Sequence, residues 1–335
     1  MISYAVVIPT LVRDTLADCL AALAAARGPR PDEIVLVDDR PSPAPGADDA
    51  MQHALSVLGD LRDRTTVMNG GGHGPAAARN TGLRAVTAPW VAFLDDDVQV
   101  GPHWCAQLLR DLEEASPDTA GVQGVITVPL PGGRRPTDWE RGSAGLARAR
   151  WTTADMAYRT EVLKQAGGFD ARFPRPFRED ADLALRLLDA GWRIRRGHRT
   201  TLHPLRPASR WASLEQQRGN ADDALMCRLH GPDWWDKAVA PRGRIRRHAA
   251  ITAAGAAACL LGATGHRRAA SACALGWAAG TAEFARARIV PGPRTRHEVA
   301  TVLATSVAIP PAATWHRLAG AWRHRHAPAW PETTR

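Results

Sequence analysis

The feature that most constrains the fold is an apolar run, residues 91–94, followed directly by Asp95, Asp96 and Asp97. An apolar run of this kind is typical of a strand buried on both faces of a parallel sheet. The three carboxylates would then lie at the carboxyl end of the strand, where open α/β sheets bind their ligands. Adjacent acids repel one another, so we expect a cation there, and a divalent metal with oxygen ligands fits best. A solvated acidic turn is the alternative for a bare triplet.

The N-terminal part of the chain alternates predicted strands and helices. Residues 4–9 and 33–37 are predicted strands, and residues 15–26 between them carry leucines at helical spacing. The acid pair Asp38 and Asp39 follows the second strand directly. In a strand–helix–strand unit, an acid at this position commonly binds a ribose hydroxyl or a base N–H of a nucleotide. A role in a turn or a helix cap is the alternative.

A glycine-rich loop, residues 69–75, opens onto a predicted helix over residues 76–83. Such a loop lets the backbone approach a phosphate, and Arg79 would add a cationic fork. The loop differs from that of the P-loop enzymes because no Gly-Lys-Ser/Thr follows it. The sequence therefore indicates phosphate binding by another kind of α/β site.

A second acidic cluster, Glu179, Asp180 and Asp182, precedes a predicted helix over residues 183–190. The helix dipole stabilises carboxylates at this position, so simple capping also explains Asp182 taken alone. His203 follows another predicted strand and is either a metal ligand or a surface histidine. The Pro- and Gly-rich residues 129–141 are predicted to form a loop.

Length and cysteine content indicate a cytoplasmic protein with two parts. The 335 residues suffice for a large α/β domain, residues 1–240, and an appended region, residues 241–335. The five cysteines are scattered without C-x-x-C spacing, which argues against a disulfide framework or a zinc site. We expect no signal peptide, because the apolar run after Met1 is too short for one.

The positive charge of the chain is concentrated in residues 241–335, which hold fourteen arginines and three glutamates in a chain of net charge +9. Basic clusters alternate there with apolar runs at 248–261, 269–282 and 299–313, each shorter than the roughly 20 residues of a membrane span. No aromatic stacking motif points to nucleic acid, so we expect the inner face of the cell membrane as partner. A hairpin dipping into the bilayer, helices lying in its interface and an ordinary packed helical domain all stay open.

Six short segments stand in a recognisable order along residues 3–230. They are Val-Val-Ile-Pro-Thr at 6–10, Val-Leu-Val-Asp-Asp at 35–39, Ala-Arg-Asn-Thr-Gly at 78–82, Phe-Leu-Asp-Asp-Asp at 93–97, Gly-Gly-Phe-Asp at 167–170 and Glu-Asp-Ala-Asp-Leu-Ala-Leu-Arg at 179–186. In order and rough spacing the chain resembles the family 2 glycosyltransferases, in particular inverting bacterial members. The resemblance implies the α/β GT-A fold, a Rossmann-like mixed sheet, over residues 1–240, with an α-helical C-terminal region.

The resemblance also implies roles for individual residues. Asp180 matches the general base of inverting members. The residues that match donor-binding positions are Pro9, Thr10, Asp38, Asp39, Arg79, Asp95 and Asp96. Those that match ligands of Mg²⁺ or Mn²⁺ are Asp95, Asp97 and His203. Candidates for contacts with the acceptor or the diphosphate are Glu179, Gln217 and Arg218.

The leading hypothesis is thus a metal-dependent, inverting transfer of a sugar from a nucleotide-diphosphate donor to an acceptor hydroxyl, on a lipid-linked substrate, a cell-envelope glycan or a natural product. Some polymerising members carry Gln-x-x-Arg-Trp after the base, and residues 215–220 do not match it, which favours a single transfer. A sugar nucleotidyltransferase is an alternative, although residues 9–13 lack the glycine-rich loop that it should have. A non-catalytic protein that binds carbohydrate or a lipid head group is the third reading.

Overall fold

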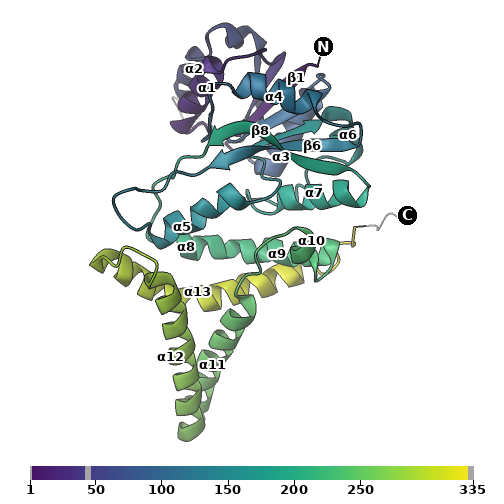
Figure 1. The fold of residues 1–335 in the computed structure, drawn as a ribbon. Helices are drawn as coiled ribbons and strands as arrows, with labels where there is room; N and C mark the ends of the chain where they lie inside the picture. The colour runs from purple at the N-terminus through teal and green to yellow at the C-terminus, as the bar shows by residue number, and fades with distance from the viewer. Residues whose placement is uncertain (1, 42–46, 331–335) are drawn as a thin grey trace. The chain divides into compact units, whose positions relative to one another are not determined.

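A mixed sheet of eight strands forms the first of two units in the computed structural model, which describes residues 2–41 and 47–330 (Figure 1). The strands are β1 (Tyr4–Thr10), β2 (Glu33–Asp38), β3 (Thr65–Asn69), β4 (Trp90–Leu94), β5 (Gln99–Val100), β6 (Thr119–Thr127), β7 (Asp155–Arg159) and β8 (Arg193–Leu202). Their order in the sheet is β3-β2-β1-β4-β7-β6-β8-β5. β1 to β4 are parallel, whereas β7 runs antiparallel to β4 and β6. The expected mixed α/β sheet is confirmed.

The first unit comprises the described residues up to Pro129, residues 146–204 and Trp330. Its helices are α1 (Thr15–Ala25), α2 (Ala47–Ser56), α3 (Pro75–Ala85), α4 (Trp104–Glu113), α6 (Thr160–Gln165) and α7 (Glu179–Asp189), with a 3₁₀ turn at Gly59–Arg64. Strands β1 and β4 are buried along their lengths because both faces of the sheet are covered. Gly82 lets α3 approach β1 closely, since a Cβ there would lie 2.4 Å from Cγ1 of Val7.

A fully buried guanidinium joins strands β6, β7 and β8 of this sheet to helix α4. Nε of Arg199, on β8, donates to Oδ1 of Asp155 at 2.7 Å, and Nη1 donates to Oδ2 of Asp111 at 2.9 Å. Nη2 donates to the carbonyl oxygen of Val122 at 2.6 Å. Asp155 also accepts from the indole N–H of Trp104 at 2.8 Å. One side chain therefore ties α4, β6, β7 and β8 together.

The second unit, residues 130–145 and 205–329, is helical. Its helices are α5 (Asp138–Ala144), α8 (Ala212–Glu215), α9 (Asn220–His230), α10 (Trp234–Lys237), α11 (Ile245–Ala263), α12 (Arg267–Ile289) and α13 (Arg296–Arg323). α11 and α12 form a hairpin (Figure 1), and α13 packs along α9. Gly320 permits the close contact with α9, because a Cβ there would lie 2.5 Å from Cα of Ala221. The expected helical C-terminal region is confirmed.

Three local expectations need correction. Residues 129–141 were expected to be a loop, but α5 begins within them, where Thr137 and Glu140 form a capping box. α7 begins at Glu179 instead of residue 183, so the acidic cluster forms its first turn. The three tail helices extend beyond the apolar runs at their basic flanks, because arginine is a good helix former.

By compactness the chain divides between Pro204 and Leu205, with residues 130–145 joining the second unit. The functional boundary near residue 240 stays a prediction. No helix in the described ranges, 2–41 and 47–330, is both long and apolar enough to cross a membrane.

Replacing Arg199 by methionine should lower the free energy of unfolding by about 3–5 kcal/mol, because two buried carboxylates lose their cation. Urea titration followed by circular dichroism measures this change. Arg196→Met, on the same strand but exposed, is the matched control and should leave stability nearly unchanged. An equal effect of the two substitutions would contradict the role given to the buried network.

Candidate active site

Two aspartates and a histidine converge at the carboxyl end of β4. One ligand atom from each of Asp95, Asp97 and His203 lies within 4.8 Å of the others. Nε2 of His203 is 3.5 Å from Oδ2 of Asp97. Two carboxylates and an imidazole are a donor set that suits Mn²⁺ or Mg²⁺. The three residues expected as metal ligands are thus brought together.

The short strand β5 explains how His203 reaches this position. β5 begins two residues after Asp97 and pairs antiparallel with the end of β8, so that Gln99 lies opposite Leu202. The backbone N–H of His203 donates to the carbonyl oxygen of Thr127 at 2.8 Å. The pairing at the edge of the sheet therefore sets residue 203 beside residue 97.

Arg79 connects the two acidic clusters. Its guanidinium is buried, with Nη2 donating to Oδ1 of Asp95 at 2.8 Å and Nη1 donating to Oε1 of Glu179 at 2.9 Å. Its charge also lies 5.6 Å from the ring centroid of Phe169. Contact of Arg79 with the donor stays a prediction, but its direct partners are these two carboxylates.

The pKa values of Glu179 and Asp180, in the second acidic cluster, are both raised. Burial raises the pKa of Glu179 to about 8, and the neighbouring charge of Asp180 adds to this while Arg79 opposes it. Burial also raises the pKa of Asp180, against the N–H of Ala181, which donates to its Oδ1 at 2.7 Å. The charges of Arg79 and Arg178 oppose the rise in pKa for Asp180, and a proton held on this cluster relieves the repulsion between neighbouring acids. A carboxylate with a raised pKa is better suited to accept a proton from a hydroxyl.

Asp96 points away from its two neighbours. Its Oδ2 accepts from the hydroxyl of Thr10 at 2.8 Å and from the backbone N–H of Leu11 at 3.3 Å, and Arg13 lies 3.3 Å from its Oδ1. The triplet is therefore divided: Asp95 and Asp97 belong to the metal-ligand cluster, whereas Asp96 fastens the end of β1. Pro9, the residue before Thr10, is paired with Val37 in the parallel sheet.

Asp39 holds the glycine-rich loop. Its carboxylate accepts from the backbone N–H of His73 at 3.1 Å and of Gly74 at 2.8 Å. Gly70 must be small here, since a Cβ would lie 2.7 Å from Oδ1 of Asp39. Asp38 instead accepts from Nε of Arg40 at 2.8 Å. The acid pair and the loop, separated by thirty residues, form one structure at the end of β2.

Several motif residues have structural partners that sequence reasoning missed. Asn80 exchanges two hydrogen bonds with the backbone of Phe169, at 2.7 and 2.8 Å. Arg186 donates to Asp182 at 2.9 Å and to the carbonyl oxygen of Gly168 at 2.6 Å. The spacing of four residues between Asp182 and Arg186 was a readable signal for an ion pair on one helix face. These bonds fix the start of α7, and with it Asp180.

Gln217 and Arg218 belong to the second unit, in a 3₁₀ turn, where Nε2 of Gln217 donates to the carbonyl oxygen of Ser213 at 2.8 Å. Their expected contact with acceptor or diphosphate stays a prediction.

Residues 5–182 match the family model described as glycosyl transferase family 2. The chain belongs to this family. Pre-mycofactocin glycosyltransferase of Mycobacterium tuberculosis is 30% identical over 203 residues, which cover 57% of this chain and 40% of that protein. Validoxylamine A glucosyltransferase of Streptomyces hygroscopicus is 35% identical over 107 residues, 31% of this chain and 22% of that protein. The chain thus spans less than half the length of these curated relatives.

Among solved structures, the mannosyltransferase PcManGT from Pyrobaculum calidifontis, in complex with GDP-Man and Mn²⁺, is similar with a TM-score of 0.52 at 17% identity. The match covers 96% of this chain and 87% of that one. At this identity the likeness concerns the fold, and the GT-A fold expected for this family 2 member is confirmed.

The raised pKa of Glu179 predicts a pH-dependent stability. The folded chain keeps a proton up to about pH 8 that an unfolded glutamate releases near its usual 4.5. Between these values the folded state binds more protons, so the free energy of unfolding should decrease as pH rises. Glu179→Gln stays neutral and should remove most of this decrease, as measured by urea titration across that pH range. The exposed Glu161→Gln is the control, and an unchanged slope in Glu179→Gln would contradict the assignment.

Proposed function

We propose that the protein is a glycosyltransferase that moves a sugar from a nucleotide-diphosphate donor to an acceptor hydroxyl, with a divalent metal and inversion at the anomeric carbon. The observation that carries this proposal is the connection, through Arg79, of the Asp95–Asp97–His203 cluster with Glu179 and Asp180. One side of this arrangement suits a metal diphosphate, and the other suits proton transfer. Family membership and the fold shared with a mannosyltransferase support it.

Asp95, Asp97 and His203 would hold Mg²⁺ or Mn²⁺. The ion, when bound, supplies positive charge to the diphosphate as it leaves. Asp97 is nearly fully buried, with 1% of its side chain exposed, so a cation beside it would be attracted through a medium of low polarity. PcManGT was solved in complex with both Mn²⁺ and GDP-Man, which supports the same pairing of ion and donor here.

Asp180 would act as the general base. Its carboxylate would take the proton of the acceptor hydroxyl while that oxygen forms a bond to the anomeric carbon. On the opposite face, the bond to the nucleoside diphosphate would break and the diphosphate would leave with the electron pair. A direct displacement of this kind inverts the configuration. The raised pKa of Asp180 makes it a stronger base than an ordinary aspartate.

The loop held by Asp39 supports a donor site at the ends of β1 and β2. Thr10, Asp38 and Asp39 all lie where these parallel strands end, with Thr10 opposite Asp38 in the register. Parallel sheets bind nucleotides at this edge. We assign the base and ribose of the donor to it, and the diphosphate to the end of β4.

Two substitutions should separate metal binding from proton transfer. Asp180→Asn should lower the transfer rate roughly a hundredfold to ten-thousandfold while leaving Mn²⁺ and donor binding intact. Asp97→Asn should weaken Mn²⁺ binding, because a neutral amide replaces a charged ligand. Calorimetry with Mn²⁺ and with GDP- and UDP-sugars measures binding, and release of nucleotide measures turnover.

Asp189→Asn, exposed near the end of α7, is the control and should change neither quantity. Retained turnover in Asp180→Asn, or loss of donor binding in that variant, would remove Asp180 from its role. Unchanged Mn²⁺ affinity in Asp97→Asn would argue against the metal site.

We also propose that the α11–α12 hairpin contacts the anionic inner face of the cell membrane. Residues 249–265 carry no charge, and after His266 the helix α12 begins with Arg267 and Arg268. Leu260 and Leu275 are 67% and 71% exposed. Apolar side chains beside a basic turn are complementary to acyl chains beside anionic head groups.

Vesicle sedimentation with the full chain tests this contact. Binding should require an anionic lipid such as phosphatidylglycerol and should weaken with salt. Arg267→Glu combined with Arg268→Glu should lower binding by about tenfold or more, since each basic residue contributes about 1 kcal/mol near such a surface. Arg62→Glu combined with Arg84→Glu, both exposed on the first unit, is the charge-matched control. Equal binding by both double variants would contradict the proposal.

A further inference from the structure

A cavity of 390 Å³ lies within the second unit. Its walls are the start of α5, the segment 205–213 and the first turns of α13. None of its lining residues belongs to the metal-ligand cluster or to the acidic cluster of α7. The sequence motifs left this part of the chain without a role.

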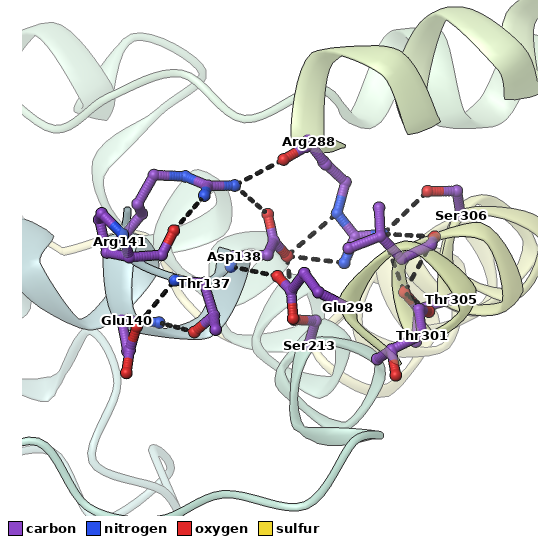
Figure 2. A network of polar contacts seen from close by, with 12 residues as sticks. Thr137, Asp138, Glu140, Arg141, Ser213, Arg288, Glu298, Thr301, Thr305 and Ser306 are labelled. Carbon is purple, nitrogen blue, oxygen red and sulfur yellow. Dashed lines mark hydrogen bonds and ion pairs between the residues drawn. The ribbon is translucent and has the colours of Figure 1, made fainter. Parts of the chain in front are cut away.

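The network of polar contacts in Figure 2, most of whose members are half-buried, includes residues that line one side of this cavity. Arg288, on α12, donates to Oδ2 of Asp138 through Nη2 at 2.7 Å and through Nε at 3.0 Å. The same guanidinium donates to the hydroxyls of Thr305 at 3.0 Å and Ser306 at 2.9 Å. The backbone N–H of Asp138 donates to Oε1 of Glu298 at 2.7 Å. Helices α12 and α13 therefore hold the first residue of α5 by both its side chain and its backbone.

The rest of α5 is fastened in the same way. Arg141 donates to the carbonyl oxygen of Arg288 at 2.7 Å and to that of Pro136 at 2.7 Å. Glu140 closes the capping box and pairs with Arg134 at 2.6 Å, which lowers the pKa of Glu140 to about 2. A network satisfied at so many points preorganises the wall that it builds. The wall presents the indole of Trp139, whose Nε1 donates to the carbonyl oxygen of Arg206 at 3.3 Å.

The lining indicates the chemistry of a ligand. Beside Trp139 the cavity offers the hydroxyls of Ser209 and Thr301, the imidazole of His297 and the guanidinium of Arg210. The acids and the arginines of the lining, Asp138, Glu140 and Glu298 against Arg206, Arg210 and Arg288, balance in formal charge. A phosphate would be favoured by an excess of cations, and an acyl chain by a wholly apolar wall, whereas here Leu205, Pro207, Ala208 and Val302 line the cavity together with these polar groups. An aromatic face among groups that both donate and accept suits a neutral polyhydroxylated ligand.

We propose that this cavity binds the acceptor through a neutral saccharide or polyol portion. The proposal rests on the glycosyltransferase function above. Two of the three walls follow strands of the first unit closely in the chain, since residue 130 is three positions after the end of β6 and Leu205 is two positions after His203. The chain therefore connects this cavity to the candidate active site through short segments. Arg288 is a positioning residue in this scheme, because it acts through Asp138 and α5.

Direct binding to the full-length protein tests the cavity without requiring turnover. The probes are maltose and trehalose as neutral saccharides and glucose 6-phosphate as the charged counterpart, each followed by saturation-transfer NMR and by calorimetry. The neutral probes should bind, and Trp139→Ala should lower their affinity at least tenfold. Thr301→Leu, which fills the cavity from α13, should have the same effect. Trp315→Ala is the matched control, since Trp315 is 68% exposed and does not line the cavity.

Donor hydrolysis with Mn²⁺, measured on the same preparations, separates this proposal from the function on which it rests. Trp139→Ala and Thr301→Leu should hydrolyse the donor at the rate of the unaltered protein, while any transfer to a saccharide shows a raised KM for the acceptor. No binding of either neutral probe, preference for glucose 6-phosphate, or unchanged affinity in both cavity variants would overturn the cavity assignment. Absence of donor hydrolysis in the unaltered protein would instead count against the glycosyltransferase function.

Discussion

The candidate active site depends on one buried guanidinium. Arg79 is bonded to Asp95 from the first acidic cluster and to Glu179 from the second, and without it the buried carboxylate of Glu179 would have no cation beside it. Burial is the main cause of the raised pKa of Glu179, the charge of Asp180 adds to it, and the charge of Arg79 opposes it. Arg79 thus joins the two clusters and limits the rise of this pKa.

The change of strand direction between β4 and β7 makes this meeting of clusters possible. β7 begins at the edge of the sheet where β4 ends, since Asp155 lies opposite Leu94, and it runs away from that edge. The chain then forms α6 and reaches Gly168 and Phe169, which are bonded to Arg186 and Asn80. The fully buried Arg199 then secures the strands of this half. The fold positions Asp180 through a chain of buried polar contacts.

Apolar runs and helical spacing can be recognised locally, and they predicted β1, β2 and β4 and helices α1 and α3, whereas β3 and β5 were not predicted. The grouping of Asp95, Asp97 and His203 was expected from the resemblance to family 2. The hydrogen-bond partner of each acid within a motif could not be predicted. Asp96 accepts from Thr10 and Asp39 accepts from the backbone N–H of Gly74, and both partners are distant in the chain. Arg199 looked like any other arginine of a basic strand, since its partners Asp111 and Asp155 come from separate elements. The capping box of α5, by contrast, could have been predicted from the three-residue spacing of Thr137 and Glu140.

The C-terminal helices are more than a basic appendage. Arg288 and Glu298 hold the start of α5, so a segment inserted between two strands of the catalytic unit obtains its structure from residues about 150 positions later. Such a segment cannot be altered independently of α12 and α13. If acceptor recognition resides in the cavity that these elements line, then a change of acceptor requires coordinated changes in both stretches of sequence. The proposed donor site, which consists of residues at strand ends and on α7, would not have to change with them.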